Sequence, residues 1–211
     1  MATVITVAQQ KGGAGKTTVV AQLAVAWSKS RSVALIDIDP QGSLSAWYRE
    51  RQEKLGAAAG GLHLSDIPGW KIGTELDKLR RRFDIVVIDS PPHAETEARA
   101  AIRSGDLVVV PIQPSPMDLW ATRATLDLAT KEKRPALLVI NRLPPRGKLP
   151  ETVLAALRES GTPIAQSTLG NRMAFASSMM EGRGVVETAH GTQASDETEA
   201  LAAEIVARAG R

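Results

Sequence analysis

The stretch TVITVAQQKGGAGKTT, residues 3–18, decides the fold of this 211-residue chain. It joins an apolar strand pattern that ends at Gln9, a glycine-rich turn, and a helical pattern that begins at Lys16. This order gathers consecutive backbone N–H groups around one point, where the dipole of the new helix also favours negative charge. The stretch therefore predicts a phosphate-binding loop at a strand–helix junction.

The rest of the chain continues the same alternation of short aliphatic runs and longer helical patterns, which is typical of βαβ units and a parallel sheet. The runs are almost continuously apolar, as strands covered on both faces should be. We expect strands at 3–9, 33–37, 85–89, 107–111 and 136–141, with weaker candidates at 62–64 and 163–166. Helices should begin near residues 16, 44, 72, 95, 118, 151, 172 and 195, while 56–61 and 144–150 should be loops. The prediction is one α/β domain over residues 1–211, with a doubly wound, mostly parallel sheet and helices on both faces.

The composition excludes several kinds of site. Cysteine is absent, which removes disulfides, thiolate metal sites, cysteine nucleophiles and iron–sulfur clusters. The N-terminus lacks the pattern of a secretory signal, and no apolar run approaches the length of a membrane span. A net charge of +3 and a pI near 9.4 permit a nucleic-acid surface without arguing for one. We expect a cytoplasmic protein that does not bind a membrane.

The glycine-rich loop predicts a division of labour among its residues. The glycines bring the backbone close to the phosphates, Lys16 reaches the β- and γ-phosphates, and the Thr17 hydroxyl ligates Mg²⁺. The alternative is a turn that merely closes a strand–helix junction, and lysines flanking three glycines before paired threonines argue against it. We therefore expect ATP or ADP with Mg²⁺, bound through Gly12, Gly13, Ala14, Gly15, Lys16, Thr17 and Thr18.

The loop also departs from the strict P-loop pattern. That pattern requires a glycine where this chain has Gln10, and here Lys11 precedes the first glycine instead. Because Lys16 already serves the phosphates within one chain, a second lysine is best explained as a catalytic charge donated across a dimer interface, as an arginine finger is supplied in trans. The alternative for Lys11 is a solvated loop lysine.

Two acidic segments follow strands that should end beside this loop. DIDPQG occupies residues 37–42 and DSPP residues 89–92, and both should open on the ligand-binding edge of a parallel sheet. Asp89 fits the role of holding magnesium through water, while Asp39 could ligate the metal site and orient or activate the attacking water. Asp37 should hold Asp39 in position without contacting the ligand itself. Each acid alone could equally be a cap of a strand or helix, and their combination with the loop favours catalysis.

Together these motifs resemble the deviant Walker-type ATPases, and within them the ParA family of partition ATPases. The segment VPIQPSPMD at 110–118 looks like the proline-rich segment of small, ParF-like members. The resemblance implies a P-loop NTPase fold, slow ATP hydrolysis, and an ATP-bound sandwich homodimer that coats DNA without sequence specificity. A ParB-like or cargo adaptor protein would stimulate hydrolysis, and the cargo could be plasmid DNA, chromosomal DNA or a protein assembly on the nucleoid.

The resemblance also implies roles for residues outside the loop. Segments 39–43 and 89–93 would be switches that sense the γ-phosphate, and Asn141 with Arg142 would contact adenine. A turn or cap role for Asn141 is equally open. Arg172 is the first candidate for a DNA contact and Arg183 the second. Further cations could extend that surface or form an ordinary solvated face: Lys131, Lys133, Arg134, Arg142, Arg146 and Lys148.

Other functions fit less well. A nitrogenase-like reductase needs cysteine ligands, and a tyrosine kinase of this superfamily should carry a tyrosine-rich tail, whereas the only tyrosine is Tyr48. A MinD-like membrane ATPase should end in a basic amphipathic helix, but residues 196–211 are mixed in charge. A metabolic ligase or synthetase that uses the same loop remains the alternative from a different class.

Overall fold

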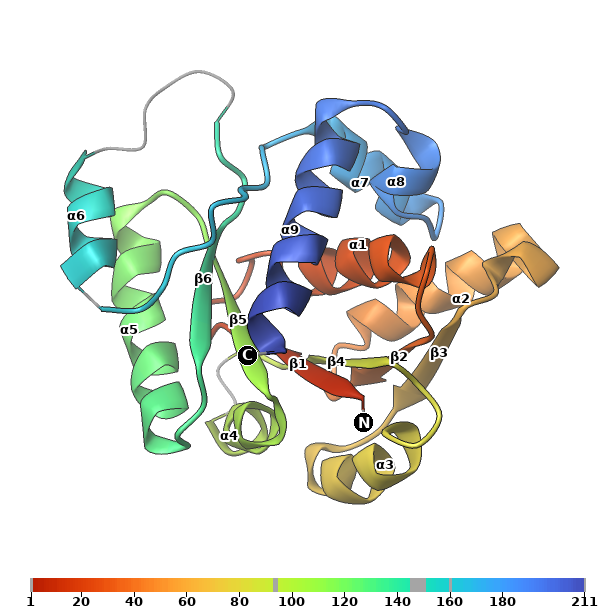
Figure 1. The fold of residues 1–211 in the computed structure, drawn as a ribbon, viewed down its shortest axis with the longest axis horizontal. Coiled ribbons are helices and arrows are strands. Elements are labelled where there is room, and N and C mark those ends of the chain that lie inside the picture. Colours follow the sequence, from red (N-terminus) through yellow and green to blue (C-terminus); the bar gives the residue numbers. More distant parts are fainter. Residues whose placement is uncertain (1, 93–94, 145–150, 160, 211) are drawn as a thin grey trace.

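A six-stranded parallel sheet forms the centre of the molecule (Figure 1). The computed structural model describes residues 2–92, 95–144, 151–159 and 161–210. The strands are β1 (Thr3–Val7), β2 (Val33–Asp37), β3 (Leu62–Asp66), β4 (Ile85–Asp89), β5 (Leu107–Ile112) and β6 (Ala136–Ile140), in the order β3-β2-β4-β1-β5-β6. The predicted doubly wound, parallel α/β fold is confirmed, and β2 and β4 have the predicted bounds.

Helices cover both faces of the sheet because neighbouring strand residues point to opposite sides. The helices are α1 (Lys16–Ser28), α2 (Ser43–Leu55), α3 (Ile72–Leu79), α4 (Glu95–Ser104), α5 (Pro116–Lys131), α6 (Glu151–Glu159), α7 (Met173–Met180), α8 (Val185–Thr188) and α9 (Gln193–Ala209). Val33 and Leu35 pack with α1, α2, α7, α8 and α9, whereas Ala34 and Ile36 pack with α3 and α4 on the other face. A third cluster joins β5 and β6 to α4, α5 and α6.

Two weak parts of the sequence behave differently from the prediction. Residues 163–166 do not form a strand, although Ile164 makes an isolated parallel bridge to Leu138. The ladder stops there because the amides of Gln166 and Ser167 donate to the Glu204 carboxylate, both at 2.9 Å, instead of to β6. Residues 56–59 of the expected loop form a 3-10 turn, η1 (Gly56–Ala59), and a second such turn is η2 (Gly69–Lys71).

The register of the sheet brings several strand ends to one level. Asp89 pairs with Val7 of β1 and with Asp37 of β2, so the loops after these three strands open on the same carboxyl edge. Among the described residues, none of the helices is long and apolar enough to cross a membrane. Residue 93 of the expected second switch, and Arg146 and Lys148, lie outside the described residues.

Candidate nucleotide-binding site

The loop between β1 and α1 has the backbone shape of an anion cradle. Gly13 and Gly15 adopt positive φ angles of 78° and 87°, a conformation that side chains rarely tolerate. A Cβ atom at residue 15 would also lie 2.5 Å from the Asn141 side-chain nitrogen. Helix α1 begins directly after this glycine, so its first amides and its positive dipole end face the loop. The loop can therefore surround a phosphate chain with backbone donors.

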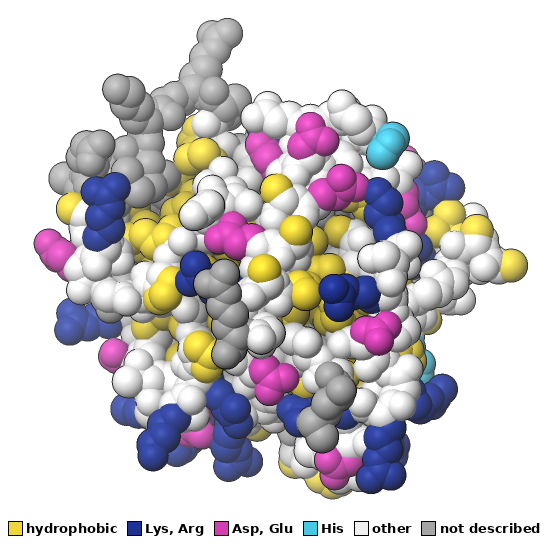
Figure 2. Space-filling view, viewed as in Figure 1, with side chains coloured by type: hydrophobic (Ala, Val, Ile, Leu, Met, Phe, Trp, Pro, Cys, Tyr) yellow, Lys and Arg dark blue, Asp and Glu magenta, His cyan; other side chains and the backbone are white. Residues whose placement is uncertain are grey.

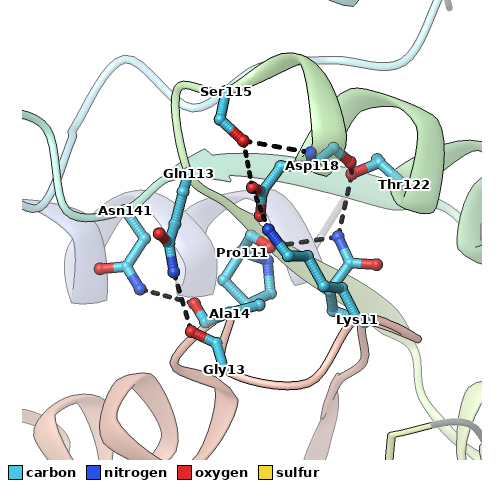
Figure 3. A network of polar contacts seen from close by, with 10 residues as sticks. Lys11, Gly13, Ala14, Pro111, Gln113, Ser115, Asp118, Thr122 and Asn141 are labelled. Carbon is cyan, nitrogen blue, oxygen red and sulfur yellow. Dashed lines mark hydrogen bonds and ion pairs between the residues drawn. The ribbon is translucent and has the colours of Figure 1, made fainter.

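Two side chains from neighbouring strand ends hold this loop from outside (Figure 3). Asn141 Nδ2 donates to the Ala14 carbonyl at 2.9 Å, and Gln113 Nε2 donates to the Gly13 carbonyl at 2.8 Å. Asn141 Oδ1 also accepts the Arg142 amide at 2.9 Å. Asn141 is thus a clamp on the loop, a structural role that differs from the turn or cap role left open for it. Base contacts by Asn141, and by the exposed Arg142 with its φ of 54°, stay predictions.

Lys16 and Thr17 lie side by side in sequence but have different surroundings. Lys16 is only 7% exposed, and this burial lowers the pKa of its ammonium, while the charges of Asp89 and Asp39 oppose that effect. The Thr17 hydroxyl donates to Asp89 Oδ2 at 2.7 Å. The loop lysine, the hydroxyl and the strand-end carboxylate therefore form one cluster at the carboxyl edge.

Asp89 is the buried acid of this cluster. It is 1% exposed, and burial raises its pKa to about 7, although the hydrogen bond from Thr17 acts in the other direction. Among the described residues, its Oδ1 atom has no hydrogen-bond partner. A divalent cation would satisfy this oxygen, and one carboxylate with one hydroxyl is the sparse protein contribution typical of Mg²⁺ bound to phosphates. No group of three or more His, Cys, Asp or Glu that could hold a metal by itself occurs in the described ranges.

Asp37 and Asp39 form a small network after β2. The buried Asp37 carboxylate accepts Ser45 N at 2.9 Å, Ser45 Oγ at 2.7 Å and Asp39 N at 3.1 Å. Burial raises the pKa of Asp37, and these hydrogen bonds oppose the rise. Asp39 is half-buried, and its Oδ1 accepts the Gln41 amide at 2.9 Å. Asp37 thus anchors the Asp39 loop to the start of α2, as expected, and the catalytic role of Asp39 stays a prediction.

Lys11 forms an ion pair with a residue outside the nucleotide loop. Its ammonium lies 2.6 Å from Asp118 Oδ2 in α5 (Figure 3). Ser115, which caps α5, donates its hydroxyl to the same carboxylate oxygen at 2.5 Å. Lys11 therefore forms an ion pair with an acid that is 1% exposed, while its own side chain is 32% exposed.

Sequence reasoning did not find Gln113, Ser115 or Asp118. Their segment was noted only for its prolines, and the expected start of α5 at residue 118 is two residues late. Ser115 followed by Pro116 and, three residues after the serine, by an acid is a helix-start pattern. Polar residues directly after the 107–112 strand should also lie at the ligand edge. Both signals were available in the sequence.

Among the described residues, no side-chain hydrogen bond or ion pair joins Arg172 or Arg183 to the nucleotide loop or to each other. Arg172 precedes α7 and forms a two-point ion pair with Glu197, with Nη2–Oε1 at 2.5 Å and Nε–Oε2 at 3.1 Å. Arg183 follows α7, is half-buried, and has no carboxylate within 4 Å among the described residues. Their DNA roles stay predictions, and that of Arg172 competes with Glu197.

Comparison with known proteins adds a family and a set of relatives. Residues 5–185 match the CobQ/CobB/MinD/ParA nucleotide binding domain. The maintenance of carboxysome distribution protein A of Gloeobacter kilaueensis is 34% identical over 194 residues, which cover 87% of this chain and 84% of that protein. The protein of the same name from Halothiobacillus neapolitanus is 27% identical over 212 residues, which cover 96% of this chain and 95% of that protein. The septum site-determining protein MinD of Pyrococcus horikoshii, solved with Mg-ADP, has the same fold, with a TM-score of 0.80 and 21% identity. The match covers 100% of this chain and 98% of that chain.

Proposed function

This chain belongs to the CobQ/CobB/MinD/ParA nucleotide-binding family, and from that premise we propose that it is a Mg²⁺-dependent ATPase that positions a cargo through ATP-driven dimerisation. One observation carries the proposal. Thr17 and Asp89 meet at 2.7 Å beside the buried Lys16, under a glycine loop that can cradle phosphates. The Mg-ADP complex of the MinD relative supports the same class of ligand for this chain.

The triphosphate would be held mainly by charge and backbone donors. Burial destabilises the Lys16 ammonium, and the charges of Asp89 and Asp39 offset this only in part, so phosphate oxygens that reach it stabilise it further. The amides of residues 12–18 and the start of α1 supply further donors to the same anion. Phosphate binding therefore stabilises the buried Lys16 ammonium and adds hydrogen bonds from the loop backbone.

Thr17 and Asp89 would hold the metal ion, and the Asp39 carboxylate would lie close to the same site. Magnesium held there would supply positive charge that offsets the negative charge of the phosphate oxygens. Asp39 sits on the loop that Asp37 anchors, and its carboxylate affects the pKa of both Lys16 and Asp89. We assign Asp39 the task of orienting the attacking water.

Dimerisation would complete the site through Lys11. Since Lys11 points to Asp118 and not to its own phosphates, its use in catalysis requires it to leave that ion pair for the phosphates of a second copy. The two carboxysome-distribution relatives favour cargo positioning over the small-molecule ligase that the sequence left as an alternative. We propose that the cargo is a protein assembly or DNA, that an adaptor protein stimulates hydrolysis, and that the track is the DNA of the nucleoid.

Calorimetry with ATP and Mg²⁺ tests this function. The parent protein should bind ATP, and Lys16→Ala should abolish binding because the loop loses its main compensating charge. Lys29→Ala, an exposed lysine just after the far end of α1, is the matched control and should bind like the parent. Equal ATP affinity of Lys16→Ala and the parent would refute the assignment, as would a parent protein that does not bind ATP.

A further inference from the structure

Positive charge concentrates at the edge of the sheet opposite the nucleotide loop. We define the basic edge as the four connections that lead from a helix into β2, β4, β5 and β6, each counted from the last two helical residues: 27–32, 78–84, 103–106 and 130–135. Its ten cations against three carboxylates give +7, whereas the whole chain carries only +3. The cations are Lys29, Arg31, Lys78, Arg80, Arg81, Arg82, Arg103, Lys131, Lys133 and Arg134, and the carboxylates are Asp84, Asp106 and Glu132.

The four connections form one continuous surface. Ser32 N and Oγ donate to Asp84 at 2.8 and 2.7 Å, Arg80 Nη2 donates to the Ser104 carbonyl at 3.5 Å, and Val108 N donates to the Pro135 carbonyl at 2.9 Å. These bonds follow the strand order β2-β4-β1-β5-β6, so the basic edge runs across five neighbouring strands. With about 4.8 Å between strands, the row is about 19 Å long. Figure 2 shows Lys and Arg side chains along the lower margin, where Figure 1 places α3, α4 and the end of α5.

Most of these cations lack an acidic partner. Lys29, Lys78 and Arg80 pair with carboxylates. Among the described residues, the other seven have no carboxylate oxygen within 4 Å, and they are Arg31, Arg81, Arg82, Arg103, Lys131, Lys133 and Arg134. The ends of four helices contribute only about −0.5 charge each, so helix dipoles offset a minor part of the excess. Like charges at this density repel one another unless an anion binds them.

The chemistry of the edge fits a nucleic-acid backbone better than a lipid surface. Six of the ten cations are arginines, whose planar guanidinium matches phosphate oxygens in a two-point geometry. A membrane-surface site needs large apolar side chains that enter the bilayer. The described residues expose Trp70, Met117, Trp120, Met173 and Met180, and none of these lies in the basic edge.

The region of the two leading sequence-based DNA candidates, Arg172 and Arg183, has the opposite charge, whereas the secondary candidates Lys131, Lys133 and Arg134 belong to the basic edge. Residues 161–210 contain three arginines, Arg172, Arg183 and Arg208, against six carboxylates, a net charge of −3. One of these carboxylates, Glu197, already neutralises Arg172. A DNA backbone that approached α7 and α9 would therefore meet repulsion, whereas the basic edge attracts it from a distance.

We infer that the basic edge is the surface that binds double-stranded DNA through its phosphates, without reading the base sequence. The inference rests on the proposed function, of which it names the DNA-contacting surface. The edge lies opposite the carboxyl edge that holds Lys11, Asp39 and the loop, so a dimer formed through the nucleotide sites leaves both basic edges exposed. In such a dimer the two basic edges face away from each other, so each edge should bind DNA by itself, and only DNA long enough to reach both edges should bind the dimer more tightly than the monomer.

The test compares two variants with equal loss of charge. The edge variant is Arg81→Gln/Arg82→Gln/Arg103→Gln/Lys131→Gln, and the control is Arg49→Gln/Lys71→Gln/Arg123→Gln/Arg158→Gln, with all eight positions exposed. Binding to a random-sequence DNA duplex is measured over a range of salt concentrations, with a non-hydrolysable ATP analogue. The edge variant should bind at least tenfold more weakly at low salt, with a salt slope shallower by up to about 3.6, because each of the four lost phosphate contacts removes about 0.9.

Four results would overturn the inference. The edge variant could bind DNA like the parent, it could lose no more affinity than the control, or Arg172→Gln alone could cost more affinity than the edge variant. Vesicles with 30% phosphatidylserine provide a further arm, and edge-dependent vesicle binding without DNA binding would also refute it. ATP affinity, measured for the parent and both variants, should be equal, and a parent that fails to bind ATP would instead contradict the proposed function.

Discussion

The ammonium of Lys11 lies 2.6 Å from the carboxylate of Asp118, which is 1% exposed. The ion pair connects the start of the nucleotide loop to the first turn of α5, which lies 107 residues later in the sequence. If Lys11 left, Asp118 would keep only the Ser115 hydroxyl on Oδ2, since Oδ1 has no partner among the described residues. Breaking the pair thus leaves a buried charge poorly satisfied, which opposes any use of Lys11 elsewhere.

Asp118→Asn should make ATP-dependent dimerisation easier, because Lys11 no longer has to leave a buried carboxylate. A hydrogen bond to a charged group contributes about 1.5–3 kcal/mol, so we expect the dimer to tighten by about tenfold or more. Sedimentation velocity with a non-hydrolysable ATP analogue measures the change. Asp127→Asn, an exposed acid of the same helix, should leave dimerisation unaltered. A weaker dimer in Asp118→Asn would mean that Asp118 acts within the dimer.

Lys11→Ala should separate nucleotide binding from dimerisation. The variant keeps Lys16, Thr17 and the loop backbone, so its affinity for ATP in calorimetry should equal that of the parent. Its dimer with the ATP analogue should be lost, because no charge reaches the second site. Persistence of that dimer would refute the exchange of lysines between copies. A parent protein that stays monomeric with the analogue would refute it as well.

Asp39→Ala should bind ATP and stop turnover. The residue lies on the loop anchored by Asp37 and is assigned to the attacking water, so its loss should lower kcat by about 10²-fold or more. Phosphate release and ATP affinity are measured on the same preparation. The control is Asp66→Ala, an exposed acid at the end of the edge strand β3. Hydrolysis at the parent rate by Asp39→Ala would contradict the assignment.

Asp89 should make the nucleotide-free protein less stable as the pH rises. Its folded-state pKa of about 7 exceeds the ordinary value of 3.8, so the folded chain binds more protons than the unfolded chain between these pH values. The free energy of unfolding should therefore fall from pH 4.5 to 7.5 in EDTA, on the order of a few kcal/mol. Asp89→Asn should remove much of this slope, while the raised pKa of Asp37 keeps the remainder. Urea titrations across this range decide, and an unchanged slope in Asp89→Asn would contradict the prediction.

Asn141→Ala should weaken the binding of all nucleotides by the same factor. The variant leaves the Ala14 carbonyl without its clamp, so the loop loses preorganisation at a cost of about 1–1.5 kcal/mol, or roughly tenfold in affinity. ATP and GTP affinities should fall by the same factor in calorimetry. Gln113→Ala removes the neighbouring clamp on Gly13 and should act in the same direction. A selective loss of ATP would instead identify Asn141 as a reader of the base.

Local patterns predicted the parts of this fold that depend on neighbours in sequence. β2 and β4 are aliphatic runs that end in an acid, so their bounds were correct to the residue. The loop glycines and the position of Asp37 behind Asp39 follow from the same short stretches. β1 ends at Val7, two residues before the predicted end, because the chain leaves the sheet where the loop begins.

Long-range pairs could not be predicted in this way. Lys11 meets Asp118 only because β1 and β5 are neighbours and Ser115 caps α5 at that edge. Arg172 is occupied by Glu197 because α9 packs back beside the start of α7. The basic edge likewise emerges only from the strand order, since its cations are scattered over residues 29–134 of the sequence.

The parallel sheet also insulates one end of the molecule from the other. Its strands are filled by aliphatic side chains with almost no exposure, and such a packed layer has no second arrangement into which it can move. A nucleotide bound at one end therefore cannot rearrange the cations of the basic edge through the sheet. We expect ATP to act on these cations by holding copies of the chain together.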